Sequence, residues 1–462
     1  SDSGTVRPWS SAMRLTIGSF RGKAVALSVL ALVGGVLVAA PGTNADAVAA
    51  QAPPEIAPVT ATPARPNPNQ AVVVAARLPQ AATATLTYKV MFGVDVVVPF
   101  RDNAASPGGA GDGVFGASIP GQAAGKLVRY RIDATSAGVA LSEPPAADSV
   151  RYRGVVVRNP GVSSQLPTVE WFMDDAVYQD ILANHRYDKF KGDAVWALDG
   201  EVIDGVKMSI RGNSSRANPK VNWKVAMPAG YEFDLGGQLR YPLDEFALQA
   251  YASNFADVAW STVRAAGNRG LEIVPVRTQR NGQFWSLGRI METMDGAWRD
   301  DKGVDDWAIY KGDGGSVGRT SSPADLQARE WLDKKARKNE DYTDAWTLSN
   351  NVDAPASPAQ LAWIYRNVNV PELMNYMATN AIIRHHDSGW YNWWLARDTA
   401  DTGRWEMWHW DLDWTFTNKN SDSKGEFLTP DTSNKFTQAM LAYPELRQMY
   451  FRRLRTLADQ FL

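Results

Sequence analysis

The feature that most constrains the fold of this chain is a change of pattern near residue 157. Before it, from Gln70, short β-rich runs alternate with turn residues, whereas strand-like and helix-like segments mix over the rest of the chain. A length of 462 residues is typical of about two or three folded units. We therefore expect an α+β protein in which an all-β domain precedes a larger mixed domain.

The all-β domain is expected over residues 70–157. Runs of this length with regularly spaced turns are typical of an immunoglobulin-like or fibronectin-like β-sandwich. The acidic, glycine-rich turn at 108–113 is interpreted as a hairpin loop, with a Ca²⁺-binding loop as the alternative. The predicted strands are 71–76, 83–90, 94–100, 114–119, 127–133 and 150–157.

The N-terminal region has the pattern of an export signal. Met13 is followed by basic residues, by the apolar run 24–40 and by a small-x-small site at 45–47. We predict that a bacterium exports the protein to its cell surface or to the medium. The alternative is that the signal is not cleaved and anchors the protein in the membrane, and membrane association is expected only in that case. The predicted segments are 1–47 (signal with an upstream extension), 48–69 (Pro/Ala-rich linker), 70–157 (sandwich), 158–167 (linker) and 168–462 (mixed domain).

Composition limits the chemistry. The chain has no cysteine and only four histidines, which excludes disulfides and thiolate metal sites and disfavours a multi-histidine centre. Any metal is therefore expected to have oxygen ligands, as Mg²⁺, Mn²⁺ and Ca²⁺ do. The net charge of −2 gives no indication of nucleic-acid binding, and the sequence does not determine the oligomeric state.

The mixed domain is predicted to begin with strands and to end with helices. Asn281-Gly282 is a strong hairpin signal, and Gly267 should end a helix. The predicted strands are 206–211, 221–227, 246–249, 273–279, 285–291, 390–396 and 405–410. The predicted helices are 258–266, 324–338, 358–365 and 371–385, and the chain ends in a helical pattern.

Acids and an amide gather between residues 385 and 414. Asp387 precedes Asn392 by five residues, and Asp411 and Asp413 follow about two dozen residues later. Phosphoryl transfer needs such a set: one acid for the acceptor hydroxyl, and an amide and another acid for a metal on the nucleotide. On an extended strand, Asp411 and Asp413 would share a face while Leu412 turns into the core. The alternative is a set of turn and capping acids, and the tryptophans around them are interpreted as packing residues.

Upstream residues can supply a phosphate site. Arg211 to Arg216 form a small polar loop after a predicted strand, and its backbone N–H groups, with the side chains of Asn213 and Ser214, can face phosphate. Lys220 and Lys224 are expected on one face of the next strand. Glu292 can pair with such a lysine.

Together these residues resemble the CotH family of atypical protein kinases, first known from spore coats. The resemblance extends over about Thr168 to Leu462 and rests on the order and spacing of the motifs. They are Arg211-Gly212-Asn213-Ser214-Ser215 with the lysine-bearing strand, Asn281-Gly282 leading to Glu292-Thr-Met-Asp295, Asp387 with Asn392, and Trp410-Asp411-Leu412-Asp413.

The resemblance implies a two-lobed, kinase-like catalytic domain and a role for each matching position. It implies that Asp387 orients the acceptor hydroxyl and that Asn392 and Asp411 bind metal, with Asp413 as a further acid. Lys224 would pair the phosphates and Glu292 would hold it, although Lys220 and Lys311 compete for the lysine role. The family's cofactors are ATP with Mg²⁺ or Mn²⁺. Unlike ordinary kinases, the chain has no Gly-x-Gly-x-x-Gly loop.

The expected function is therefore a secreted or surface protein kinase that phosphorylates Ser or Thr hydroxyls of a protein substrate. Two alternatives stay open. One is a metal-dependent glycosyl or nucleotidyl transferase, because an Asp-x-Asp motif also serves that chemistry. The other is a non-catalytic surface or polysaccharide-binding protein, which the sandwich and the tryptophans favour.

Overall fold

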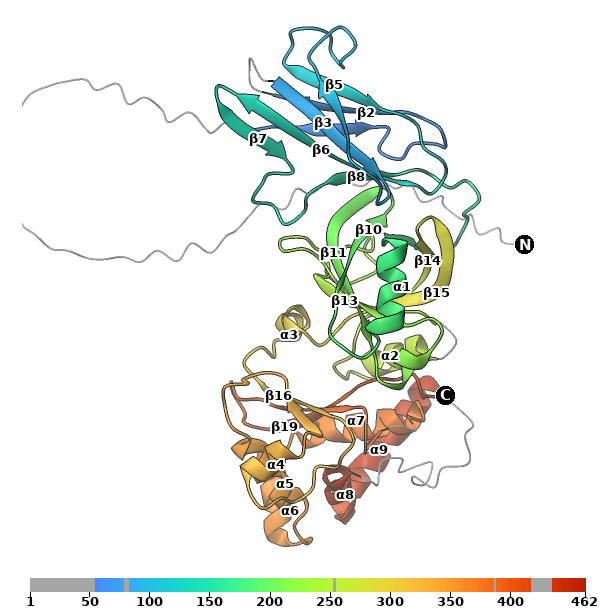
Figure 1. Cartoon of the computed structure of the whole chain (residues 1–462). Helices are drawn as coiled ribbons and strands as arrows, with labels where there is room; N and C mark the ends of the chain where they lie inside the picture. The colour runs from blue at the N-terminus through green and yellow to red at the C-terminus, as the bar shows by residue number, and fades with distance from the viewer. Residues whose placement is uncertain (1–54, 79–82, 252–254, 386–387, 417–433) are drawn as a thin grey trace, which may run out of the picture. The chain divides into compact units, whose positions relative to one another are not determined.

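The computed structural model describes residues 55–78, 83–251, 255–385, 388–416 and 434–462. The fold of this part is mixed α+β (Figure 1). The predicted export signal and Asp387 lie outside the described residues. Among the described helices, none is both long enough and apolar enough to cross a membrane.

Two antiparallel sheets form the N-terminal part. One has the order β1-β2-β5, and in the other β4, β3, β6 and β7 follow one another while β8 also pairs with β6. Fully buried Val74, Leu86, Ile119 and Ile132 come from both sheets and belong to one hydrophobic core. The strands are β1 (Val59–Thr62), β2 (Val72–Arg77), β3 (Thr83–Val90), β4 (Val96–Phe100), β5 (Val114–Ile119), β6 (Leu127–Ser136), β7 (Val139–Glu143) and β8 (Arg153–Val156).

All the strands predicted for this part are confirmed, and two more are present. β7 was missed, and β1 lies inside the stretch assigned to a linker. That assignment is wrong for residues 59–62, because the alternating Val-Thr-Ala-Thr run pairs along β2 from Val59↔Ala76 to Thr62↔Val73. The immunoglobulin-like class stays a prediction.

The glycine-rich turn is held by its own acids. The carboxylate of Asp102 accepts hydrogen bonds from the backbone N–H groups of Gly111 (2.7 Å) and Gly113 (2.9 Å), and Asp112 accepts one from Val114 (2.9 Å). Carboxylates that satisfy backbone donors in this way favour the hairpin-loop interpretation.

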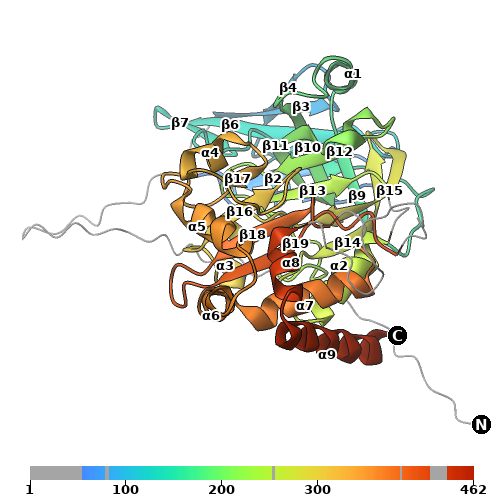
Figure 2. The same ribbon diagram turned by 90° about the horizontal axis from the view of Figure 1, so that it is seen from below.

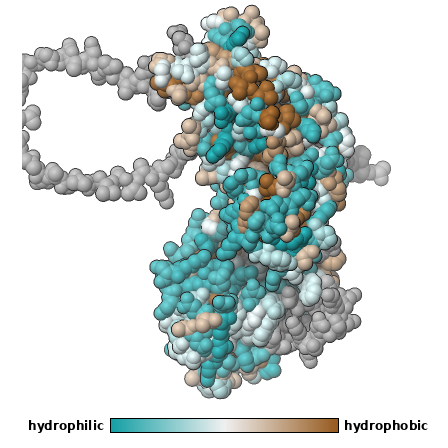
Figure 3. Space-filling view, viewed as in Figure 1, coloured by the Kyte–Doolittle hydropathy of each residue, from teal (hydrophilic) through white to brown (hydrophobic). Residues whose placement is uncertain are grey.

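Apolar residues gather on the surface of the N-terminal sheets, whereas the C-terminal part is mainly hydrophilic in the same view (Figure 3). Val94, Val96 and Val97 of the segment that links and begins β4 are among the exposed large apolar residues.

A closed barrel follows, with the order β10-β11-β12-β13-β15-β14-β9. The β14–β9 pair is parallel and the others are antiparallel. Trp171, Trp196 and Trp223 fill its core. The strands are β9 (Thr168–Phe172), β10 (Gly192–Leu198), β11 (Glu201–Arg211), β12 (Asn222–Ala226), β13 (Glu245–Gln249), β14 (Ile273–Arg280) and β15 (Gln283–Met291); the helices are α1 (Asp175–Asn184) and α2 (Ala256–Ala265).

The predicted hairpin and helix end are confirmed here. Asn281 (φ 52°) and Gly282 (φ 80°) form the turn between β14 and β15, and both have the positive φ that a tight hairpin turn needs. Gly267 (φ 85°) follows α2.

Glu170 on β9 is held in an environment that disfavours its charge. Burial raises the pKa of its carboxyl from 4.5 to about 7, an effect that the charge of Arg65 opposes. The folded state therefore binds this proton more tightly than the unfolded state, and the free energy of unfolding should fall as pH rises from about 4.5 to about 7. The rise in pKa corresponds to at most about 3 kcal/mol.

We expect Glu170→Gln to flatten this pH dependence. The variant should gain up to about 3 kcal/mol over the wild type at pH 8 and almost nothing at pH 4. Denaturant unfolding at both pH values measures the effect. Glu201→Gln, on the exposed start of β11, is the matched control; parallel pH profiles for wild type and Glu170→Gln would contradict the prediction.

The C-terminal part packs helices around a four-stranded sheet with the order β17-β16-β18-β19 (Figure 2). Its core includes Tyr310, Tyr376, Trp393 and Tyr450. The strands are β16 (Ala308–Gly312), β17 (Leu332–Lys334), β18 (Trp393–Arg397) and β19 (Trp405–His409). The helices are α3 (Gly296–Lys302), α4 (Pro323–Ala328), α5 (Thr343–Val352), α6 (Pro358–Asn367), α7 (Val370–Ile382), α8 (Lys435–Leu441) and α9 (Pro444–Phe461).

The prediction of one helix over 324–338 is wrong beyond Ala328. Glu330 has a positive φ of 57°, which breaks the helix, and Leu332 then pairs with Gly312 as part of β17. Strand pairing outweighs the local helical preference of this charged segment.

Candidate active site

Three strands of the C-terminal sheet bring polar residues to one edge. β18 pairs Trp393 with Gly312 of β16 on one side and with His409 of β19 on the other. The ends of β16 and β19 therefore meet the start of β18. Lys311 and Asp313 at the end of β16, Asn392 before β18 and Asp411 after β19 leave the sheet at this edge.

The backbone turns sharply here. Asn392 and Asp411 have φ values of 62° and 51°, in the left-handed region that Asn and Asp tolerate better than most residues. The expectation that Asp411 and Asp413 lie on an extended strand is wrong, because β19 ends at His409 and a turn follows. Leu412 is nevertheless buried, as expected, and both acids reach the same cavity.

That cavity, of about 410 Å³, joins the two halves of the predicted site. Arg211 and the loop after it form one wall, and Asp411 and Asp413 form another. The lining residues are Arg211, Gly212, Asn213, Ser214, Ser215, Asn218, Asn222, Gln249, Tyr251, Asp411 and Asp413. Residues separated by 200 positions thus share one polar cavity.

The loop after β11 is held rigidly. Gly212 has a φ of 101°, and a Cβ at this position would collide with Oγ of Ser215, so glycine is required. Arg216 donates from Nε to the carbonyl of Gly212 (2.6 Å) and from Nη1 to the carbonyl of Arg186 (2.8 Å). Arg186 in turn donates to the carbonyl of Arg216 (2.6 Å). The loop is therefore shaped before any ligand binds.

A family comparison agrees with this geometry. The family model described as CotH kinase protein matches residues 208–462, which contain the loop, the acids and both walls of the cavity. The chain belongs to the CotH kinase family. The match begins within β11, later than the resemblance expected from Thr168.

Other comparisons add little. No curated protein sequence matches the chain. A cycloalternan-forming enzyme of Listeria monocytogenes, solved with a pentasaccharide, is 10% identical, with 43% of this chain and 22% of that chain covered and a TM-score of 0.16. An uncharacterised protein of the same organism, solved with glucose, magnesium and calcium, is 13% identical, with 59% and 25% covered and a TM-score of 0.17. The chain spans a quarter or less of these structures, and the likeness carries no argument.

Burial disfavours the charged forms of several side chains at this site of the CotH kinase family member, although Asp411 and Asp413 are accessible to solvent. Burial lowers the pKa of Arg211, and its Nη1 is buried with no hydrogen-bond partner among the described residues. Burial also raises the pKa of Asp411, and the positive charges of Arg211 and Lys311 oppose this rise. The carboxylate of Asp411 is accessible from the cavity while protein surrounds it on its other sides. A buried guanidinium without a hydrogen-bond partner beside a desolvated carboxylate favours a polyanion with a cation.

Among the competing lysines, Lys311 lies nearest to this chemistry. Burial lowers its pKa, and the charges of Asp313 and Asp411 act against that shift. Its Nζ is 4.0 Å from Oδ2 of Asp313 and 5.6 Å from the ring centre of Trp410. Lys311 is not itself among the residues that line the cavity, but its ammonium group interacts electrostatically with Asp411, which is.

The other two lysines have different partners. Lys220 donates from Nζ to the carbonyl of Trp285, away from the cavity, although its backbone N–H donates to the hydroxyl of Tyr251 (3.1 Å). Lys224 forms an ion pair with Glu245 (2.7 Å) at a half-exposed position.

The expected pair of Lys224 and Glu292 is not formed. Lys224 on β12 lies opposite Ala247 on β13, and Glu245 is two residues before Ala247 on β13. Glu245 is therefore the acid that pairs with the ammonium group of Lys224. Glu292 follows the end of β15, is buried, and accepts a hydrogen bond from the backbone N–H of Glu272 (2.5 Å) and another from Tyr241. The role implied for Glu292 has no support in these contacts.

Two histidines near the cluster belong to the protein interior. His385 and His409 are buried, and the ring of His409 is 4.6 Å from that of Tyr376. Burial and the charge of His385 lower the pKa of His409 well below its usual value. His409 is thus neutral at ordinary pH and serves the core. His386 and Asp387 lie outside the described residues.

The residues present fit a hard divalent cation. Asp411 and Asp413 offer carboxylate oxygens to the cavity, and Asn213, Asn222 and Gln249 bring amide groups to its walls. Mg²⁺ is commonly held by one or two carboxylates plus substrate phosphates. Over the described part of the chain, no three His, Asp or Glu side chains gather closely enough to hold a metal ion by themselves.

Several residues of the site were missed by sequence reasoning. Asn218 and Asn222 lie in or beside the polar loop already singled out, and Asp313 stands in the glycine-rich run 312–315, a signal that could have marked it. Gln249 and Tyr251 carry no sequence signal, because only the closure of the barrel brings them to the cavity.

Proposed function

We propose that this protein is a kinase that transfers the γ-phosphoryl group of ATP to Ser or Thr hydroxyls of a protein substrate. One observation carries the proposal: the Arg211 loop and the acids Asp411 and Asp413 line a single polar cavity. Phosphoryl transfer depends mainly on positioning and on electrostatic stabilisation, and it needs cationic donors and metal-binding acids within reach of the same phosphates.

The proposal extends to the architecture. The barrel, which carries the phosphate loop, would be one lobe of a kinase-like domain, and the C-terminal sheet with its helices, which carries the acids, would be the other. The two N-terminal sheets around their shared core would form the β-sandwich that precedes it.

Each side chain has a part in the proposed reaction. Backbone N–H groups of the loop and the guanidinium of Arg211 bind phosphate oxygens, and Lys311 offsets their charge. Asp411 and Asp413 would hold Mg²⁺ or Mn²⁺, with Asn392 as the further ligand that the family resemblance implies. When bound, the cation neutralises charge on the phosphates. Asp387, also by resemblance, would orient the acceptor hydroxyl and receive its proton.

Location and partners belong to the same proposal. The N-terminal signal pattern supports a protein exported by a bacterium, to act at the cell surface or outside the cell. Its partner would be a protein with accessible Ser or Thr residues, and the net charge of −2 gives no reason to add nucleic acid.

Incubation with ATP, Mg²⁺ and a panel of acceptor proteins, followed by mass measurement of the products, tests the proposal. The expected gain is one phosphate per modified Ser or Thr. A gain of one sugar from a sugar nucleotide, or of one nucleotide from ATP, would instead support the transferase alternatives.

ATP binding can be tested without knowing the acceptor. We expect Mg-ATP to raise the melting temperature of the full chain, because a ligand that binds only the folded state stabilises it by mass action. The same shift should be absent in Asp411→Ala. No shift in the wild type, together with binding of cell-wall glycan, would favour a non-catalytic surface protein.

A further inference from the structure

A second cavity lies away from the proposed catalytic site. Its volume is about 690 Å³, and it is formed by α7, the end of α2, the segment after α6, the turn before β19 and α9. Cavities of this size are typical of small-molecule sites. None of its lining residues belongs to the Arg211–Asp411 cavity.

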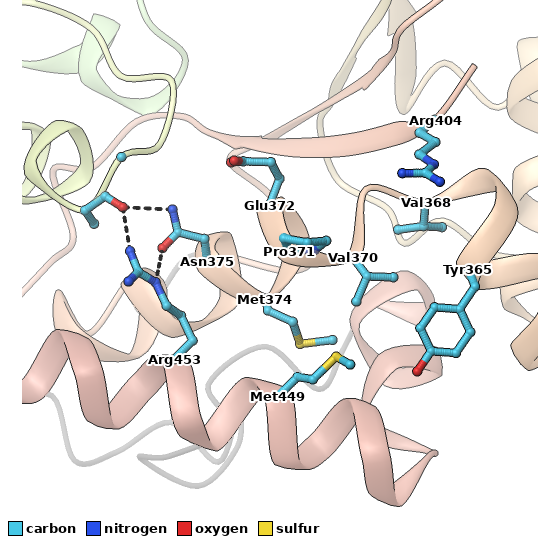
Figure 4. Close-up of a pocket in the computed structure, with 12 residues that line it drawn as sticks. Tyr365, Val368, Val370, Pro371, Glu372, Met374, Asn375, Arg404, Met449 and Arg453 are labelled. Atoms are coloured by element: carbon cyan, nitrogen blue, oxygen red, sulfur yellow. Dashed lines mark hydrogen bonds between the residues drawn. The ribbon is translucent and has the colours of Figure 1, made fainter. Parts of the chain in front are cut away.

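The interior of this cavity is apolar and adaptable. Val368, Val370 and Met374 form a buried floor, and Tyr365 and Met449 stand at the rim with exposures of 40% and 41%. Figure 4 shows the side chains of Met374 and Met449 pointing toward one another from α7 and α9. Methionine side chains change shape easily and accept varied apolar groups.

One end of the cavity is already closed by its own hydrogen bonds. Arg453 donates from Nε to Oδ1 of Asn375 (2.7 Å) and from Nη2 to the carbonyl of Ala266 (2.8 Å). Asn375 donates to the same carbonyl (2.9 Å), as the dashed lines in Figure 4 show. These groups satisfy one another and hold the helices in place, so they do not need a ligand.

Two other charged groups of the lining are not satisfied in this way: Glu372 is half-buried and Arg404 is exposed to solvent. Glu372, in the first turn of α7, and Arg404, before β19, have no side-chain hydrogen bond or ion pair within the described residues. Burial and the charge of Glu406 raise the pKa of Glu372, against the charges of Arg269 and Arg453. Arg269 is occupied by Glu406 (3.4 Å). A half-buried carboxylate and a free guanidinium thus border one apolar floor.

We propose that this cavity binds a zwitterion with an apolar side chain, such as a short hydrophobic peptide with free ends. Its ammonium group would meet Glu372, its carboxylate would meet Arg404, and its side chains would lie against Met374 and Met449. Figure 4 shows Glu372 and Arg404 above the apolar side chains, with Pro371 below Glu372 and Val368 below Arg404. A simple cation or anion could pair with only one of these two charges, whereas a zwitterion can pair with both.

Three matched probes test this on the full chain: L-leucyl-L-leucine, its N-acetyl derivative and its C-terminal amide. Calorimetry should show binding of the free dipeptide and about tenfold weaker binding of each blocked form, because each has lost one charged hydrogen-bonding group. Glu372→Gln should remove the discrimination against the acetylated form, and Arg404→Gln that against the amide.

Glu445→Gln and Arg447→Gln, exposed on α9 outside the cavity, should bind all three probes as the wild type does. Met449→Trp, at the rim, should block the free dipeptide without lowering the melting temperature. Equal affinity for free and blocked dipeptides, or no binding of any of them, would overturn the proposal. The catalytic assays do not depend on the outcome, since the two cavities share no residue.

Discussion

Asp411→Asn should lower the rate of phosphoryl transfer by a factor on the order of 10² to 10³ while the domain stays folded. The change keeps the size of the side chain and removes the negative charge that would bind the cation. Stability should not suffer, because burial already raises the pKa of Asp411 and so disfavours its charged form. Steady-state phosphorylation and a thermal melt measure the two effects.

Asp401→Asn is the matched control for this change. Asp401 is exposed in the turn between β18 and β19, on the same hairpin as Asp411 but away from the cavity. Its substitution should leave the rate within about twofold of the wild type, as surface changes usually do. An Asp411→Asn enzyme with full activity would remove Asp411 from the proposed mechanism.

Lys311→Met should be the most damaging of the lysine substitutions, with a loss of about 10²-fold in rate. The methionine keeps an apolar side chain of similar length and removes the ammonium group, which lies over the ring of Trp410 and interacts with Asp411. Lower affinity for ATP should accompany the loss of rate, since the ammonium group would contact phosphates in the ground state as well.

Two further variants decide between the competing lysines. Lys224→Met breaks a half-exposed ion pair with Glu245, and such pairs contribute about 0 to 1 kcal/mol, so the effect should be small. Lys220→Met removes a hydrogen bond to the carbonyl of Trp285, so it should lower the stability of the fold more than it lowers the rate of phosphoryl transfer. If Lys224→Met or Lys220→Met lost more rate than Lys311→Met, the substituted lysine, and not Lys311, would be the one that pairs with the phosphates.

Local signals in the sequence predicted most of the barrel and the N-terminal sheets. The Asn281-Gly282 turn and the β-rich runs depend on neighbours in the chain, so they can be recognised without the fold. The segment 324–338 could not be predicted in this way, because Leu332 takes its conformation from a strand that precedes it by 20 residues. The short strand β1 was hidden by the prolines around it.

The sequence predicted many residues of the site, but it did not predict which of them contact one another. Arg211, Asn213, Ser214, Asp411 and Asp413 carry recognisable motifs, and the structure brings them to one cavity. The partner of a lysine, however, depends on strand register, which single motifs do not encode. Lys224 therefore meets Glu245 instead of Glu292, and Lys311, on a strand that was not predicted, is left beside Asp411.

The separation of Arg211 from Asp411 along the chain has a consequence for how activity first arises. While the protein is being synthesised, the barrel with its shaped loop can form well before the strand that precedes Asp411 exists. A chain truncated before β19 would carry a phosphate loop but neither Asp411 nor Asp413, and it should neither bind Mg-ATP tightly nor transfer phosphate. Nucleotide binding would then report that the last third of the molecule has folded onto the rest, and no proteolytic fragment from either side of the cavity should retain it.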